Sequence, residues 1–482
     1  MLKRSFSNPI RSSNRQKNQR HPPVGAAIAL AAFGLTCTAM MAFPTAAFDR
    51  SKAPETRSKA VSPDLTVAHA HTDKFFDDGD LFQAVKQIEL TWEGAYETYF
   101  GTELSEASLT TKQIAAILKR IGRRTGQKPA LIYMVPADEQ LELVLITPGR
   151  PPLRQSIPAA HRESLLTTAR SLRREITDPR KTGTTSYLDP AQQLYQWLIA
   201  PLEAELQKRD IETLLFCVGT GLRSLPLAAL HDGQQFLVEK YNFALIPGFN
   251  MMETRYGDIR DEQVLAMGAS QFRELPPLPA VSVEMETIAP KLWRGRVFLN
   301  ERFTLQKLRS QLQRQRYGIV HLATHAEFQP GKASNSYIQL WDTKLTLDEM
   351  RDLPLESLPV ELMVLSACRT ALGDPEAEMG FAGLAVNSGV KSALASLWYV
   401  SDAGTLALMT EFYQQLRSVP IKAEALQEAQ MAMLKGAVRL EGDALRGTGD
   451  DVSLPPELTD LDAKNLSHPF YWAAFTLVGS PW

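Results

Sequence analysis

The sequence has few cysteines and no excess of one charge. Its 482 residues include only three cysteines, too few for a disulfide framework, so a hydrophobic core must stabilise the fold. The 52 basic and 54 acidic residues give a net charge of −2, which excludes a chain-wide electrostatic field for nucleic acid or an anionic membrane. Hydrophobic residues make up 44% of the chain, enough for a full core, and the length predicts two to three domains.

Several motifs that would define a function are also missing. The sequence contains no phosphate-binding loop, no cluster of metal ligands and no nucleic-acid-binding motif. It also lacks the Gly-x-Ser-x-Gly turn of serine hydrolases. His69 and His71 have no other ligand nearby, so a solvated linker explains them better than a metal site. We therefore expect no metal, no cofactor and no nucleic-acid partner.

The one marked charge asymmetry lies at the N-terminus. Residues 1–23 carry six Lys or Arg and no acid, and an uncharged run follows from Val24 to Phe43. Thr45 and Ala47 supply the small side chains that a signal peptidase requires. These features predict a secretory signal peptide over residues 1–47 and an exported bacterial protein, periplasmic or extracellular. The run is also long enough to span a bilayer, so an uncleaved membrane anchor through residues 24–43 is the alternative.

The rest of the chain divides into segments by its periodicity. The segments are a polar linker (48–76), a helical segment (77–126) and two α/β halves (127–270 and 271–482). In the helical segment, apolar residues recur every three or four positions from Leu81 to Tyr99. A second helix follows, capped by Thr110 or Thr111, and ends before Gly126. Strands and helices alternate in both halves, so we expect an α/β fold in which a mostly parallel sheet is sandwiched by helices.

Local patterns predict individual elements within the two halves. The predicted elements are a hairpin (Ala130–Val135 and Leu141–Thr147), one helix (Leu194–Leu206), two strands (Phe236–Val238 and Val264–Met267), a polar loop (373–378) and an exposed loop (441–467). A proline-rich stretch near Pro276 marks the boundary between the halves.

Two short apolar strands end in reactive side chains. The run from Ile319 to Ala326 contains His325, and the run from Leu362 ends at Cys368. Because the carboxyl ends of parallel strands meet at one edge of a sheet, we expect both side chains to lie there. A histidine beside a thiol stabilises the thiolate and makes it a nucleophile. The sequence thus predicts the Cys/His pair of a thiol hydrolase.

Three similar residues are interpreted as structural. Cys217 lies inside a continuous apolar run, which favours a small buried hydrophobe. His321 shares a strand with His325 but lies deeper in it, which favours a packed and hydrogen-bonded core histidine. His468 precedes Pro469, where capping or packing is a better explanation than catalysis.

Four motifs occur in order along the second half of the sequence. They are His321–Ala326, Leu365–Asp374, Ala395–Trp398 with Asp402, and His468–Phe475. Together they resemble the signatures of the CHAT domain, a caspase-like family related to the separases. The resemblance covers about Gln127 to Trp482, and the helical segment before it looks like the one that often precedes the domain in cyanobacterial proteins. It implies an inactive pseudo-caspase half (127–270) and a catalytic half (271–482).

The resemblance implies a cysteine endopeptidase that acts on a protein or peptide substrate. His325 would be the general base and Cys368 the nucleophile that forms a thioester acyl-enzyme. The backbone N–H groups of Cys368 and Ala326 would form the oxyanion hole. Members of the family usually have Gly after the catalytic His, so the methyl group of Ala326 would add strain if this position needs a positive φ. An activating protein partner is a further implication, and a non-catalytic signalling or scaffold protein is the alternative.

Two nearby polar residues have two interpretations each. Ser366 either lines the substrate pocket or satisfies a buried backbone group. Asp402 either binds a basic side chain of the substrate or caps the helix that begins at Ala403, and the cap is favoured. The acidic residues of the loop after Cys368, Asp374, Glu376 and Glu378, are expected to be solvated.

Overall fold

The structure is a computed structural model that describes residues 76, 79–104, 108–355, 360–447, 449, 451–458 and 465–482. The predicted signal peptide or anchor and nearly all of the predicted linker, with His69 and His71, lie outside these residues. Within the described ranges, no helix is both long and apolar enough to cross a membrane.

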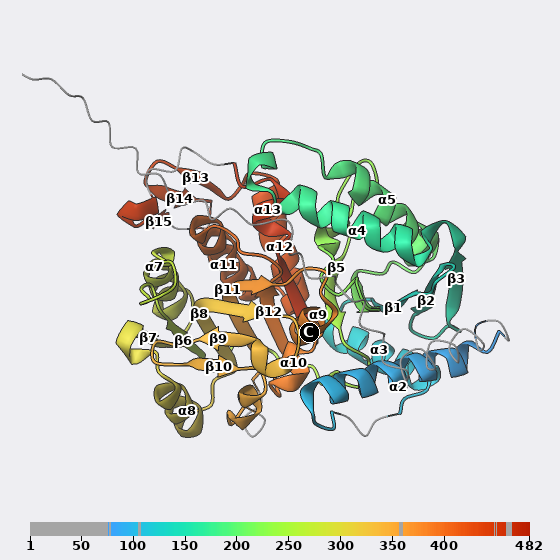
Figure 1. The fold of residues 1–482 in the computed structure, drawn as a ribbon, viewed down its shortest axis with the longest axis horizontal. Coiled ribbons are helices and arrows are strands. Elements are labelled where there is room, and N and C mark those ends of the chain that lie inside the picture. The colour runs from blue at the N-terminus through green and yellow to red at the C-terminus, as the bar shows by residue number, and fades with distance from the viewer. Residues whose placement is uncertain are drawn as a thin grey trace, which may run out of the picture. The chain divides into compact units, whose positions relative to one another are not determined.

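A mixed sheet runs through the described part of the chain (Figure 1). Its strands follow the order β10-β9-β8-β11-β12-β16-β5-β4-β1-β2-β3, and β6 pairs with β8 and with β7. Seven of the neighbouring pairs are parallel and five are antiparallel. The predicted α/β class with a mostly parallel sheet is therefore confirmed.

The strands of this sheet come from both halves of the sequence. Those before residue 250 are β1 (Pro129–Pro136), β2 (Leu141–Ile146), β3 (Leu153–Ile157), β4 (Thr213–Val218) and β5 (Asn242–Ile246). Those after it are β6 (Val264–Gly268), β7 (Gly295–Leu299), β8 (Ile319–Phe328), β9 (Tyr337–Gln339), β10 (Lys344–Thr346), β11 (Leu362–Thr370), β12 (Ser392–Ser396) and β16 (Phe475–Gly479). Every residue of β1, β4 and β5 is buried, as expected for strands covered on both faces.

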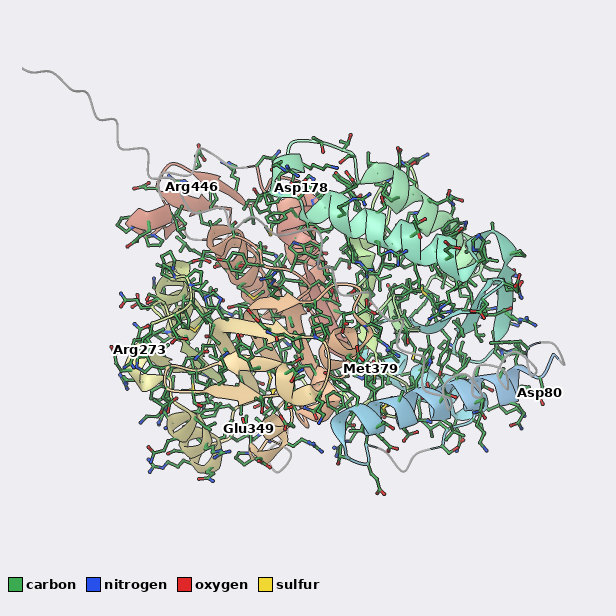
Figure 2. The ribbon with its side chains drawn as sticks, viewed as in Figure 1. Asp80, Asp178, Arg273, Glu349, Met379 and Arg446 are labelled. Carbon is green, nitrogen blue, oxygen red and sulfur yellow. The ribbon has the colours of Figure 1, made fainter. Side chains whose placement is uncertain are left out.

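Helices precede, connect and cover the strands. They are α2 (Leu81–Phe100), α3 (Thr111–Thr125), α4 (Arg162–Thr177), α5 (Leu188–Leu198), α6 (Ala200–Lys208), α7 (Ala280–Glu286), α8 (Leu305–Arg314), α9 (Pro375–Ala382), α10 (Leu384–Asn387), α11 (Asp402–Leu416), α12 (Lys422–Leu434) and α13 (Pro469–Trp472). Asp80, labelled in Figure 2, caps α2 by accepting a hydrogen bond from the backbone N–H of Gln83 at 3.1 Å.

The two faces of β8 meet different helices. On one face, His321 contacts Glu284 of α7 and Tyr413 of α11. On the other face, the ring of Phe328 packs edge-on against Phe381 of α9, with 5.6 Å between the ring centroids. The strand is therefore enclosed between helices, as the α/β interpretation requires.

Several predicted elements are present where the sequence places them. Thr110 caps α3 in a capping box with Gln113, so of the two predicted caps, Thr110 and Thr111, the first is correct. The hairpin pairs β1 with β2 in antiparallel register. Cys217 is fully buried, and burial raises the pKa of its thiol.

Other predicted elements are wrong in detail. Phe236–Val238 does not form a strand, because a 3-10 turn occupies Leu237–Glu239. The helix predicted over Leu194–Leu206 is two helices that meet at Ile199 and Ala200, just before Pro201, whose missing N–H interrupts the hydrogen-bond ladder.

The two predicted loops also contain regular structure. Residues 373–378 hold the start of α9, because Asp374 caps it by accepting from the N–H of Ala377 at 2.9 Å. The region 441–467 contributes to a separate small sheet of β13 (Arg439–Glu441), β14 (Ala444–Arg446) and β15 (Val452–Ser453).

The strand β6 lies before the predicted boundary at residue 270, but its partners lie after it. It pairs in parallel with both β7 and β8. By its pairing, β6 therefore belongs with the strands of the second half.

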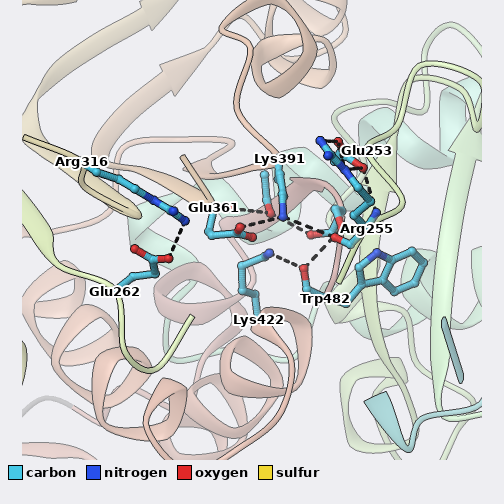
Figure 3. Close-up of polar contacts among 10 residues, drawn as sticks. Glu253, Arg255, Glu262, Arg316, Glu361, Lys391, Lys422 and Trp482 are labelled. Carbon is cyan, nitrogen blue, oxygen red and sulfur yellow. Dashed lines mark hydrogen bonds and ion pairs between the residues drawn. The ribbon is translucent and has the colours of Figure 1, made fainter. Parts of the chain in front are cut away.

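Buried charges lie at the amino ends of β11 and β12 (Figure 3). Glu361 precedes β11 and forms an ion pair with Lys391, which precedes β12, at 2.6 Å. Lys422 is almost fully buried and donates to the Trp482 carbonyl, and burial lowers its pKa to about 7. This cluster lies at the opposite ends of the strands from His325 and Cys368.

His468 caps the short helix α13, as expected for a structural histidine. Its Nδ1 accepts a hydrogen bond from the backbone N–H of Phe470 at 3.1 Å, so this nitrogen carries no proton. The side chain is nearly buried, and burial lowers its pKa to about 4.

The lowered pKa of His468 predicts a loss of stability in mild acid. The unfolded chain binds a proton at His468 near pH 6.5 and the folded chain only near pH 4, so the free energy of unfolding falls as pH decreases between these values. We expect His468 to account for a decrease of about 2 kcal/mol between about pH 7 and pH 5. His468→Asn keeps a capping oxygen without a titrating group. Urea denaturation across this range should give the variant a flatter profile, and parallel profiles would contradict the assignment.

Candidate active site

The two strands with reactive ends lie side by side. β8 and β11 are parallel neighbours, and their register begins with Ile319 beside Leu362. At the carboxyl ends, His325 pairs with Ala367 and Ala326 pairs with Cys368. The expected meeting of His325 and Cys368 at one edge of the sheet is thus present in the backbone.

A β-bulge sets this register just before the histidine. Leu365 pairs with Leu322, but Ala367 pairs with His325, so β8 has one residue more than β11 over this interval. Without the bulge, the same register would continue and place Cys368 beside His325 itself. The extra residue instead places Cys368 beside Ala326. Bulges of this kind re-aim side chains near functional sites.

His325 is held by the segment that leads into α7. Its Nε2 lies 2.9 Å from the carbonyl oxygen of Pro276, and its ring centroid lies 4.7 Å from that of Phe272. Because a carbonyl oxygen only accepts, Nε2 carries the proton of the neutral ring. The lone pair is then on Nδ1, which is the nitrogen able to accept a proton.

His321 has a different environment on the same strand. It is fully buried, its Nδ1 lies 3.0 Å from the Tyr413 hydroxyl, and its Nε2 lies 2.9 Å from Glu284 Oε1. The contact with Glu284 is short enough for an ion pair but is not aligned as a hydrogen bond. Glu284 is also buried, so the two side chains compensate each other inside the core. The prediction of a packed core histidine is confirmed.

The two histidines should therefore differ in their effect on stability. His321→Ala leaves the buried carboxylate of Glu284 without its partner, and we expect the free energy of unfolding to fall by about 3 kcal/mol. His325→Ala removes one hydrogen bond and one ring contact of a half-buried side chain, so we expect a loss of about 1 kcal/mol or less. Denaturant titration of both variants measures the difference. Equal losses would mean that His325 is also a structural residue.

Ala326 is compatible with the backbone of this site. It lies within β8 and is not one of the described residues with a positive φ. The methyl group therefore adds no left-handed strain, and the departure from Gly at this position is tolerated.

Ser366 is buried, and its Oγ has no hydrogen-bond partner among the described residues. No hydrogen bond from it to a buried backbone group is present among these residues, and its place in the substrate pocket stays a prediction. Its position directly opposite the bulge makes it a neighbour of the two reactive strand ends.

Asp402 is not the cap of α11, so the favoured interpretation is wrong. Ser401 is the cap, because its Oγ accepts from the N–H of Gly404 at 3.3 Å and Asp402 is already the first helical residue. Asp402 instead accepts from the Tyr399 hydroxyl at 2.9 Å and faces the N–H of Ala280. Burial raises the pKa of Asp402, and these hydrogen bonds act against that rise.

Two cavities flank the strand ends. One cavity, of about 600 Å³, is lined by residues that follow His325 and Cys368, such as Glu327 and Arg369. Tyr399, which follows β12, lines it as well. The other, of about 410 Å³, is lined by Phe272, which contacts His325, and by Arg273, which is labelled in Figure 2. The edge that carries His325 and Cys368 is thus bordered by space on two sides.

The sequence reasoning missed three residues that shape this edge. Pro276 acts through its carbonyl group, which every residue has, so no residue type could have identified it. Glu284 lies in a helix pattern without any mark of its role. Glu378 was expected in a solvated loop but is fully buried against Arg173, and only a fold shows this pairing because the two are far apart in sequence.

The described residues contain no group of three or more His, Cys, Asp or Glu side chains arranged to hold a metal ion.

The fold is that of an α/β protein with a histidine and a cysteine on adjacent parallel strands. The CHAT domain matches residues 188–480, which is more than half of the chain, so the protein belongs to the CHAT-domain family. The match begins later than the start at Gln127 that the sequence motifs implied.

Comparisons with other proteins add little beyond this family. No curated protein shows significant sequence similarity. Among solved structures, chains in two crystal structures of the Saccharomyces cerevisiae separase–securin complex are 11% identical to this chain, with TM-scores of 0.47 and 0.49. In both cases the alignment covers 83% of this chain and 34% of the other, so this chain spans about a third of their length.

Proposed function

We propose that this protein is a cysteine endopeptidase that hydrolyses peptide bonds through His325 and Cys368. The observation that carries the proposal is the register of β8 and β11, which brings the backbone of Cys368 beside the residue that follows His325. The hydrogen bond from His325 Nε2 to the Pro276 carbonyl supports it, because it leaves Nδ1 as the basic nitrogen. Membership of the CHAT-domain family agrees with this chemistry.

The reaction would proceed in two proton-balanced steps. His325 Nδ1 takes the proton of the Cys368 thiol, and the thiolate attacks the peptide carbonyl carbon. The tetrahedral intermediate collapses, the leaving amine takes the proton from His325, and a thioester remains. Water then attacks the thioester with His325 as base, which releases the acid and restores the thiol. The backbone N–H groups of Cys368 and Ala326 are the proposed donors to the oxyanion.

The substrate would lie across the two cavities beside the strand ends. Ser366 and Asp402 remain the proposed pocket residues. For Asp402 to bind a basic side chain, the cation must replace the Tyr399 hydroxyl on its carboxylate. Export through the N-terminal segment, or anchoring by it, and activation by a protein partner belong to the same proposal.

The proposal predicts that both residues of the pair are required for turnover. The purified protein is screened against a peptide library with and without calcium. We expect His325→Ala to lower kcat/KM by about 10²- to 10⁴-fold and Cys368→Ala to abolish turnover.

Cys217→Ala is the matched control, because Cys217 is a fully buried thiol on β4, and the strands β12, β16 and β5 separate β4 from β11 in the sheet. Its activity should equal that of the unchanged protein, and an electrophilic peptide probe should label Cys368 only. If no peptide is cleaved and the probe does not label Cys368, the protein is a non-catalytic signalling or scaffold member of the family.

A further inference from the structure

A buried polar cluster connects the first half of the chain to the segment that follows Cys368. Its centre is the ion pair of Arg173 on α4 and Glu378 on α9, with 3.3 Å between Arg173 Nη1 and Glu378 Oε1. The side chain of Glu378 is 0% exposed and that of Arg173 is 5% exposed. The cluster is therefore shielded from water, where charges interact strongly and unpaired ones are unfavourable.

Ser224 completes the cluster from the loop after β4. Its hydroxyl donates to Glu378 Oε1 at 2.5 Å and accepts from Arg173 Nη1 at 2.7 Å. The backbone N–H of Gly221 donates to Glu378 Oε2 at 3.0 Å. Burial lowers the pKa of Arg173, and the charge of Glu378 acts against this. Each polar atom of the Glu378 carboxylate is thus satisfied by the first half of the chain.

The cluster also touches the loop between β11 and α9. The N–H of Gly373 points to Ser224 Oγ at 3.4 Å. Gly373 has a φ of +83°, and a Cβ atom on it would lie 3.1 Å from Arg173 Nη2, so the guanidinium packs directly against this backbone. The same loop is tied to the histidine strand, because the N–H of Ala371 donates to the Phe328 carbonyl at 2.9 Å.

This loop borders the candidate site. Ala371 and Leu372 line the cavity of about 600 Å³, together with Thr177 at the end of α4. Arg173 lies one turn before Thr177 on that helix, and Thr177 Oγ1 donates to its carbonyl. Met379, the neighbour of Glu378, marks the position of α9 in Figure 2. The first half of the chain therefore supplies both a wall of the cavity and the anchor of the loop.

We propose that Arg173, Ser224 and Glu378 are positioning residues that fix the loop Ala371–Asp374 and, through it, the backbone of Cys368. This inference rests on the proposed peptidase function for its effect on turnover. In this inference the first half, which carries no reactive pair of its own, holds the loop Ala371–Asp374 of the second half in place.

Amide hydrogen exchange of the full chain tests the positioning directly. In Arg173→Met/Glu378→Met, apolar side chains of similar length replace the ion pair without leaving a buried charge, so the fold should persist. We expect the amides of residues 371–374 to exchange at least about tenfold faster than in the unchanged protein, while those of β8 and β11 keep their protection. Unchanged exchange of these loop amides would overturn the inference.

Two further variants keep the test informative if this one unfolds. Arg173→Met/Glu378→Gln removes both charges but keeps a polar amide, whose oxygen can accept from the Gly221 N–H while its N–H donates to Ser224 Oγ, so it should restore most of the loop protection. Ser224→Ala keeps both charges and removes the hydroxyl that accepts from the Gly373 N–H and links Arg173 to Glu378, so it should speed loop exchange by itself. The inference fails if Ser224→Ala behaves like the unchanged protein.

A second buried ion pair provides the matched control. Lys391→Met/Glu361→Met replaces the pair at the amino ends of β11 and β12 (Figure 3). It should change the melting temperature without changing exchange at residues 371–374. Faster loop exchange in this control as well would show a general loosening and overturn the specific role of the Arg173 cluster.

Turnover separates this inference from the proposed function. In Arg173→Met/Glu378→Met we expect kcat to fall about 10- to 100-fold with KM changed less than about threefold, because the nucleophile is misplaced. Absence of turnover in the unchanged protein would reject the peptidase proposal, while the exchange data would still decide the positioning role. Normal kcat in a variant with a released loop would overturn the link between the loop and Cys368.

Discussion

The pairing of β8 with β11 is the constraint on which the candidate site depends. Strand residues alternate between faces, so a slip of one residue would exchange the faces of every later side chain. The bulge absorbs one residue of β8 and sets Ala326, not His325, beside Cys368. The flanking strands β12 and β6 hold the pair on both sides, which leaves its register little freedom.

One strand carries two histidines four residues apart with different roles. His321 lies where α7 and α11 close over β8 and is balanced by a carboxylate. His325 lies where the strand leaves that cover and is held by a backbone carbonyl. The position of each histidine along β8 thus determines whether it is a structural residue or a candidate base.

The sequence predicted most of what is local and apolar. The apolar runs that contain His325 and Cys368 could be predicted as buried strands because each run is continuous in the sequence. Their placement side by side follows from the rules for parallel sheets. The bulge was not predictable, because it exists only between two strands. The burial of Glu378 was equally hidden, since its partner Arg173 is 205 positions away. Asp402 was misread because Ser401, an equally good cap, stands immediately before it.

The hydrogen bond of His325 to Pro276 has a consequence for how this protein can vary. The acceptor is a main-chain carbonyl, so exchanging the side chain at 276 leaves it in place. The connection from β6 to α7 is fixed at both ends by backbone hydrogen bonds, such as that from the Leu278 N–H to the Ser270 carbonyl at 2.9 Å. For this hydrogen bond, the length of the connection therefore matters more than the side chain at 276. A substitution at 276 would leave the carbonyl in place, whereas a single insertion or deletion in the connection would move it away from the imidazole.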